Sequence, residues 1–207
     1  MNKSSDPIQK QLREARRSQI LTAAAQVFAQ RGFHKSTTKE IAKTAGVADG
    51  TVYNYFKDKD ALLFGLLHRL NETPQRPEDL AEAAHLPFET FFKGYLSHRM
   101  GELENQITIL KALLPELLVS SDLQATYRQD ITGPTFLLAE QYFEKLRGEG
   151  KIRDLPVDLS SRVLAASVLG LTVLRLLGDQ VVEEKWTELG EVLSQVLLHG
   201  LKGEDHE

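Results

Sequence analysis

Two short helical segments joined by a glycine-containing turn constrain the fold of this chain most. Apolar residues spaced by three and four predict helices over residues 38–45 and 50–56. Thr37 and Glu40 match a capping box, in which the threonine hydroxyl accepts from the Glu40 amide and the Glu40 carboxylate accepts from the Thr37 amide. Gly46 suits the left-handed backbone that ends a helix. Behind a longer supporting helix, this pair predicts a helix-turn-helix.

The second short helix is predicted to turn one face inward and the other toward a partner. Val52 and Phe56 stand four residues apart, so they share a face and anchor the helix. The outward positions are Gly50, Thr51, Tyr53 and Asn54. Hydroxyls, an amide and an uncovered backbone suit the base edges in the major groove of DNA. A helical bundle without any DNA function also contains such pairs, and geometry alone leaves that alternative open.

The remaining sequence predicts an all-α fold. Only 7 prolines and 14 glycines interrupt the 207 residues, and no alternating strand pattern is found. Asp58 is expected to cap a fourth helix, and the sequence Asn-Glu-Thr-Pro-Gln-Arg-Pro at 71–77 marks a break. We therefore expect an N-terminal domain over 1–70 and a C-terminal domain over 71–207. Helices in the second domain are predicted at about 87–101, 103–118, 121–131, 134–148, 158–177 and 182–200.

The charge distribution separates the same two parts. Residues 1–70 contain 12 Lys and Arg and 6 Asp and Glu, a net charge of +6, whereas residues 71–207 contain 13 and 23, a net charge of −10, and the two sum to −4. A basic N-terminal domain favours a polyanion as its partner. A chance excess of cations on solvated helices is the alternative. A DNA-packaging protein would need basic charge throughout, and the acidic second part argues against it.

Residues 15–63 resemble the N-terminal domain of the tetracycline-repressor (TetR/AcrR) family of one-component transcriptional regulators. The matching residues include Ile20-Leu21, Ala23-Ala24, Val27-Phe28, Gly32-Phe33, Thr37-Thr38, Ile41-Ala42 and the run from Ala45 to Asp60 followed by Leu62-Leu63. Ala48 stands where many members have a serine cap, so Asp49 is expected to cap the recognition helix instead. The resemblance implies a three-helix DNA-binding domain with a helix-turn-helix, followed by a helical ligand-binding and dimerisation domain.

The resemblance also implies which residues meet DNA. Those expected at the phosphate backbone are Thr38, Lys39, Tyr53, Tyr55 and Lys59. Those expected at base edges are Asp49, Gly50, Thr51 and Asn54. Asn54 is the residue most expected to read a base, because its amide can pair bidentately with adenine. Packing of Tyr55 against the first helix and simple solvation of Lys59 are the alternatives.

A basic run precedes this domain. Lys10, Arg13, Arg16 and Arg17 are spaced as on one helix. The functional interpretation is an arm along the phosphates of DNA, and a solvated helix face is the alternative.

The C-terminal part is predicted to dimerise and to hold a small effector. The helix at 158–177 is apolar nearly all round, so it needs partners on both sides. With the helix at 182–200 it could form a four-helix bundle with a second copy. Aromatic residues at Phe88, Phe91, Phe92 and Tyr95 form a stripe that is either core or the wall of a pocket for an apolar effector.

An enzyme is the less favoured alternative, and no cofactor or metal is expected. The chain contains no cysteine, and neither a Walker loop, a dinucleotide fingerprint nor a Gly-x-Ser-x-Gly motif is found. The single Glu82-x-x-His85 lacks the second copy that a di-iron bundle needs, and His98 with Glu102 is read as a surface pair. The N-terminus lacks a signal peptide and the least polar stretch, 163–174, is too short for a membrane span, so a soluble cytoplasmic protein is expected.

Overall fold

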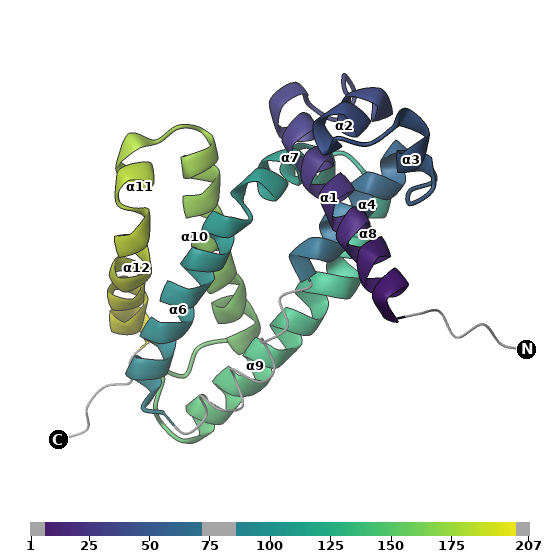
Figure 1. Ribbon diagram of the computed structural model, residues 1–207. Helices are drawn as coiled ribbons and strands as arrows, with labels where there is room; N and C mark the ends of the chain where they lie inside the picture. The colour runs from purple at the N-terminus through teal and green to yellow at the C-terminus, as the bar shows by residue number, and fades with distance from the viewer. Residues whose placement is uncertain (1–6, 72–85, 202–207) are drawn as a thin grey trace, which may run out of the picture. The chain divides into compact units, whose positions relative to one another are not determined.

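The computed structural model describes residues 7–71 and 86–201, and within these ranges the chain is helical and contains no β-strand. The all-α prediction is therefore confirmed. The chain divides into two compact units. One contains α1–α4 together with residues Thr108–Ala125, and the other contains α6 and α9–α12 (Figure 1).

The first unit is built on a long helix, α1 (Pro7–Arg31). It is followed by α2 (Thr38–Ala45), α3 (Asp49–Tyr53) and α4 (Lys59–Asn71), and the unit also takes in most of α7 (Ile107–Leu117) and α8 (Ser121–Tyr127). The core consists of apolar side chains from the facing helices. Among those with no more than 2% of their surface exposed are Ile20, Phe28, Ile41, Leu62 and Leu66. The apolar spacing seen in the sequence thus marks the buried stripe of each helix.

The division of the chain differs in one respect from the expected boundary at residue 70. Residues 108–125 belong to the first compact unit, although they were assigned by sequence to the C-terminal domain. The predicted break at 71–77 lies, apart from Asn71 at the end of α4, outside the described residues. The assignment of DNA binding to one part and effector binding to the other stays a prediction.

The second unit consists of α6 (Phe88–Asn105), a π-helical turn (Arg128–Thr132), α9 (Gly133–Gly148), α10 (Val157–Leu176), α11 (Gln180–Glu184) and α12 (Trp186–Leu201). The helices α6 and α12 pack side by side (Figure 1). They approach so closely that a Cβ on Gly190 would lie 2.7 Å from the Cα of Ser97. The indole of Trp186 donates to the carbonyl of Met100 at 3.0 Å, which fixes the start of α12 against α6.

Proline explains why the predicted helix at 121–131 is divided into α8 and a π-helical turn. Pro134 has no amide hydrogen, and its ring would clash with the carbonyl four residues earlier in an α-helix. The chain widens there instead, and the amide of Gly133 donates to the carbonyl of Arg128, five residues back. A Cβ on Gly133 would lie 2.7 Å from that carbonyl oxygen, so the glycine is required for the close approach. The predicted helix at 182–200 is likewise divided, into α11 and α12.

The helix α10 presents much of its apolar surface to solvent within a single chain. Among the described residues it is the one helix long and apolar enough to cross a membrane by length and composition, and only 17% of its most apolar window is buried. Exposed side chains on α10 include Leu159, Val163, Leu169, Val173 and Leu174. The sequence prediction that this helix needs partners on more than one side is consistent with this surface.

Candidate nucleic-acid interface

The helix-turn-helix is held in place by the predicted anchors of α3 and the residues that follow it. Val52 has 1% and Phe56 has 4% of its surface exposed, as their four-residue spacing predicted. Gly65 on α4 allows this packing, because a Cβ there would lie 3.1 Å from the Phe56 ring and 2.8 Å from Leu21. Phe56, three residues after the end of α3, therefore packs against α1 and α4.

The capping box at the start of α2 is formed as predicted. The amide of Glu40 donates to the Thr37 hydroxyl at 3.2 Å, and the amide of Thr37 donates to the Glu40 carboxylate at 2.9 Å. Arg31 adds an ion pair to that carboxylate at 2.5 Å. The hydrogen bonds from Thr37, with the charge of Arg31, hold the pKa of Glu40 below its ordinary value of 4.5. Gly46 ends the helix with φ of 63°, in the left-handed region.

Two polar contacts that could not be predicted from the sequence hold α2 in register with its neighbours. The hydroxyls of Thr38 and Tyr53 lie 2.8 Å apart, which joins the first turn of α2 to the last residue of α3. The side-chain amide of Gln19 donates to the carbonyl of Ala45 at 2.6 Å, which joins α1 to the end of α2. Each contact spans 15 residues or more. Two of the predicted DNA-contacting residues, Thr38 and Tyr53, are thus also partners of each other.

The outward residues of α3 lie together on one exposed surface, beside the start of α2. Tyr53 has 56% of its surface exposed; Lys39, Asp49, Gly50 and Asn54 are also exposed, and Thr38, Thr51 and Tyr55 are half-buried. A Cβ on Gly50 would meet no atom within 4 Å, so the fold itself does not require glycine there. An exposed glycine without a packing role leaves the backbone open to an external partner.

The expectation that Asp49 caps α3 is wrong. Ala48 occupies the cap position and makes no side-chain capping bond, and Asp49 is the first residue of the helix. A capping side chain must come from the residue before the first helical one, because only that residue faces the free amides of the first turn. Asp49 still places a carboxylate in the first turn, where the helix dipole favours negative charge. The recognition helix also ends earlier than expected, at Tyr53, with Asn54 as its C-cap.

Lys59 has a structural role that the sequence did not predict. Its ammonium donates to the carbonyls of Phe33 at 2.7 Å, Ser36 at 3.1 Å and His34 at 3.4 Å. It also lies 4.3 Å from the centre of the Phe33 ring. The alternative of a merely solvated Lys59 is therefore wrong, because this side chain ties the first residue of α4 to the loop between α1 and α2.

The same loop contacts α7 within the first unit. His34 Nε2 lies 3.4 Å from the Glu116 carboxylate, and the side chain of Glu116 is 11% exposed whereas that of His34 is 79% exposed. This pair could not be predicted from the sequence, since its members stand 82 residues apart. The loop at 33–36 is thus held by α4 on one side and by α7 on the other.

No group of three or more metal-ligating side chains occurs within the described ranges 7–71 and 86–201. His98 Nε2 lies 3.6 Å from Glu102, whose side chain is only 12% exposed, so the prediction of a surface pair holds for the histidine alone. Arg99 pairs with the other Glu102 oxygen at 3.0 Å. The motif Glu82-x-x-His85 lies outside the described residues.

Comparisons of the sequence match part of the first unit to a known family. Residues 20–66 match the family model of bacterial regulatory proteins, tetR family. The fatty acid metabolism regulator protein of Bacillus subtilis (strain 168) is 46% identical over 68 residues, which cover 32% of this chain and 35% of that protein. The transcriptional regulator UidR of Escherichia coli (strain K12) is 22% identical over 157 residues, covering 75% of this chain and 77% of UidR.

Comparison of the structure extends the likeness in fold to nearly the whole chain. The transcriptional regulator FadR from Bacillus subtilis, solved in complex with stearoyl-CoA, superposes with a TM-score of 0.73 at 22% identity. The superposition covers 88% of this chain and 98% of that chain. The all-α fold of the C-terminal part is therefore one found in a known regulator, although the sequence match is concentrated in the first unit.

Proposed function

Because residues 20–66 match the family model of bacterial regulatory proteins, tetR family, we propose that this protein is a ligand-responsive transcriptional repressor of the cytoplasm that binds a palindromic operator as a homodimer. The observation that carries the proposal is the surface of α3. Val52 and Phe56 are buried beneath it, while Gly50, Tyr53 and Asn54 are exposed above it. A short helix anchored on one face and polar on the other is the element that enters a major groove.

In this proposal the nine predicted residues divide by chemistry. Asp49, Gly50, Thr51 and Asn54 lie at base edges, and Asn54 reads adenine through its amide. Thr38, Lys39, Tyr53, Tyr55 and Lys59 lie at phosphates, where contacts orient the protein without reading sequence. The Thr38–Tyr53 contact supports this, because two hydroxyls fixed against each other present a rigid pair of donors and acceptors. Lys59 contributes its charge at the same surface while it holds the loop at 33–36.

The proposed dimer interface is the exposed apolar face of α10 and α12. Val163 and Leu169 on α10 are 58% and 45% exposed, and Val192 and Val196 on α12 are 50% and 66% exposed. Two helices from each of two copies can cover such faces as a four-helix bundle. A second copy is favoured as the occupant because a palindromic operator requires two recognition helices related by a two-fold axis. This occupant also accounts for an apolar helix that the single chain leaves uncovered.

The proposed effector is a small molecule with a large apolar part. In the second unit, Phe91 and Tyr142 stand edge-to-face with ring centres 5.0 Å apart, and Tyr95 follows with its centre 6.0 Å from Phe91. Burial raises the pKa of Tyr142, and the nearby charge of Glu149 adds to the effect, so its hydroxyl stays a donor over the physiological range. Aromatic walls with a few polar groups suit an amphipathic ligand. Stearoyl-CoA, which the FadR relative binds, is the first probe to use.

Selection of duplexes from a random library by the purified full chain tests the DNA-binding proposal. We expect a two-fold-symmetric sequence whose half-sites lie about 34–36 Å apart, one helical turn, or somewhat more. Failure to enrich any sequence would contradict the proposal.

Titration of stearoyl-CoA with and without the selected duplex tests the effector. If the ligand releases DNA, each must weaken the other by the same factor, expected at about 5–150-fold. Native mass spectrometry of the purified protein identifies any ligand that co-purifies and provides the next probe. A ligand that binds equally well in both states would not be the effector.

A further inference from the structure

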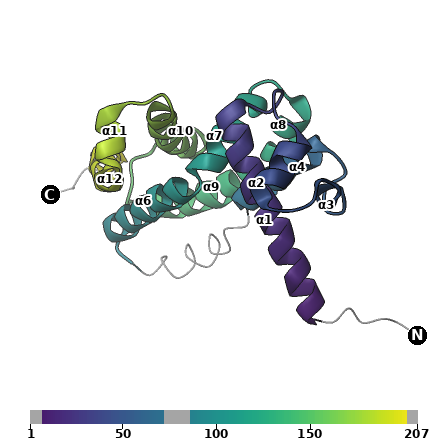
Figure 2. The same cartoon turned by 45° about the horizontal axis from the view of Figure 1, so that its top comes forward.

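The helix α1 is much longer than its packing requires. It runs over 25 residues, from Pro7 to Arg31, but its buried residues begin only at Ile20. Residues 7–16 are all exposed, and at about 1.5 Å per residue they extend the helix by roughly 15 Å beyond the core. Figure 2 shows this first part of α1 projecting from the other helices of its unit. Because it continues a packed helix, the projection needs no new helix nucleus, and we treat it as stiff.

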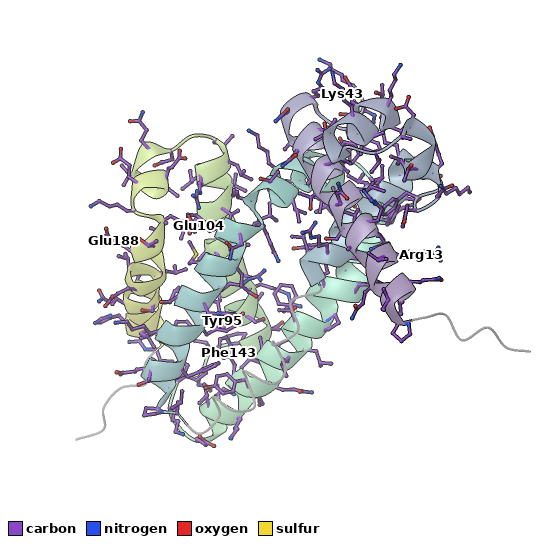
Figure 3. The ribbon with its side chains drawn as sticks, in the orientation of Figure 1. Arg13, Lys43, Tyr95, Glu104, Phe143 and Glu188 are labelled. Carbon is purple, nitrogen blue, oxygen red and sulfur yellow. The ribbon has the colours of Figure 1, made fainter. Side chains whose placement is uncertain are left out.

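Three cations in this first part of α1 form a stripe along one face of the helix. Lys10, Arg13 and Arg17 stand at i, i+3 and i+7, on one face of α1. The guanidinium of Arg17 lies 5.1 Å from the centre of the Phe56 ring, and Phe56 stands three residues after the end of α3. The stripe therefore faces the side of the first unit on which the chain leaves α3. Figure 3 shows Arg13 extending away from α1 on this side.

Within the part of the chain that the structure describes, Lys10 and Arg13 form no ion pair. Residues 7–17 contain four cationic side chains and one carboxylate, that of Glu14, which gives a net charge of +3. Arg16, off the stripe, donates to Gln19 at 3.0 Å. Stiff, unpaired cations beside a DNA-reading surface are placed to bind a polyanion.

We propose that residues 7–17 of α1 form a second DNA-binding element, in which Lys10 and Arg13 contact backbone phosphates flanking the half-site that α3 reads. This inference rests on the proposed DNA-binding function. In this position the side chains of Lys10 and Arg13 meet phosphates and not base edges, so they add affinity without sequence preference. At about 3.4 Å per base pair along the duplex, a projection of roughly 15 Å reaches about four base pairs.

The test uses the full chain and the duplex selected by it, with flanks trimmed stepwise on both sides. The double variant Lys10→Ala with Arg13→Ala removes the two free cations. The matched control is Lys145→Ala with Lys185→Ala, which removes two exposed cations from the second unit. Melting temperatures of all three proteins are measured first, and we expect them to agree because the four side chains are exposed.

We expect the arm variant to lose about 0.9 in the slope of log K against log salt for each phosphate contact removed. We also expect its affinity to fall on the order of tenfold at moderate salt, for long flanks only. Trimming about four flanking base pairs should weaken the wild type and the control, and leave the arm variant unchanged. Equal slopes and equal flank dependence in all three proteins would overturn the inference. Failure of the wild type to bind any duplex would instead overturn the proposed function.

Discussion

The ammonium of Lys59 donates to the carbonyl of Phe33 at 2.7 Å and lies 4.3 Å from the centre of the same residue's ring. One side chain at the start of α4 thus holds both the backbone and the ring of a loop residue that precedes α2. The loop carbonyls of His34 and Ser36 accept from the same ammonium. Lys59 therefore ties the loop before α2 to the start of α4, in addition to the packing of Phe56 beside Gly65.

Replacement of Lys59 by methionine keeps the length of the side chain and removes its donors. We expect Lys59→Met to cost about 1–3 kcal/mol, because the loop carbonyls lose a charged partner. For a chain of this size that corresponds to about 2–4 °C in melting temperature per kcal/mol. Circular dichroism of the full chain measures the melting temperature, and Lys57→Met, at an exposed neighbouring position, is the control. Equal melting temperatures for the two variants would show that the loop does not depend on Lys59.

Replacement of Asn54 by alanine should affect the sequence preference of the protein more than its overall affinity for DNA. We expect Asn54→Ala to relax the preference at one base pair of each half-site by about 1–3 kcal/mol. Repeating the duplex selection with the variant measures this. Lys39→Ala is the matched comparison, and should weaken all duplexes alike and lower the salt slope by about one. An unchanged consensus for Asn54→Ala would remove Asn54 from the base-reading residues.

The capping box of α2 makes the stability of the fold depend on pH in a direction that the pKa of Glu40 determines. The pKa of Glu40 is held below 4.5 in the folded chain, so the charged carboxylate stabilises the fold above that value and the contribution is lost as the pH falls through the lowered pKa. The Glu40→Ala variant should therefore have a lower melting temperature than the wild type at neutral pH. The difference between the two melting temperatures should become smaller under acid conditions. Glu14→Ala, an exposed glutamate on α1, should show no such gap, and a gap for Glu40→Ala that is constant with pH would contradict the assignment.

A charge on α10 should separate the subunits without unfolding them. Leu169 is 45% exposed in the single chain, so Leu169→Glu leaves its carboxylate in water in the monomer but buries it in the proposed dimer, where an unpaired charge is costly. We expect wild type to sediment as a dimer at micromolar concentration and Leu169→Glu as a folded monomer. Leu137→Glu, at a 60% exposed position on α9, is the control and should remain dimeric. A monomeric wild type would exclude the dimer.

The features predicted correctly from sequence were those encoded by local spacing. The capping box of Thr37 and Glu40, the end of α2 at Gly46, and the buried pair Val52 and Phe56 each depend on residues within four positions of one another. Asp58 also caps α4 as expected, since the amide of Ala61 donates to its carboxylate at 2.7 Å. Such contacts form whenever the helix forms, so the pattern is sufficient to find them.

The features that sequence did not predict depend on residues brought together by the fold. The partners of Lys59 lie 23–26 residues earlier in the chain. The contact of His34 with Glu116 joins the loop between α1 and α2 to α7. Neither residue type nor spacing marks such pairs. The packing of residues 108–125 with the first unit was missed for the same reason. The π-helical turn before Pro134 was missed because the sequence predicted two separate α-helices, at 121–131 and 134–148, and no π-helical turn joining them.

The ratio of two dissociation constants tests the central claim most directly. Binding of the full chain to its selected palindrome and to a shuffled duplex of the same length and composition is measured at the same salt concentration. We expect the palindrome to be bound about 10³–10⁷-fold more tightly, because α3 reads bases in two half-sites while the phosphate contacts are common to both duplexes. A ratio near one, with the same salt dependence for both duplexes, would contradict it.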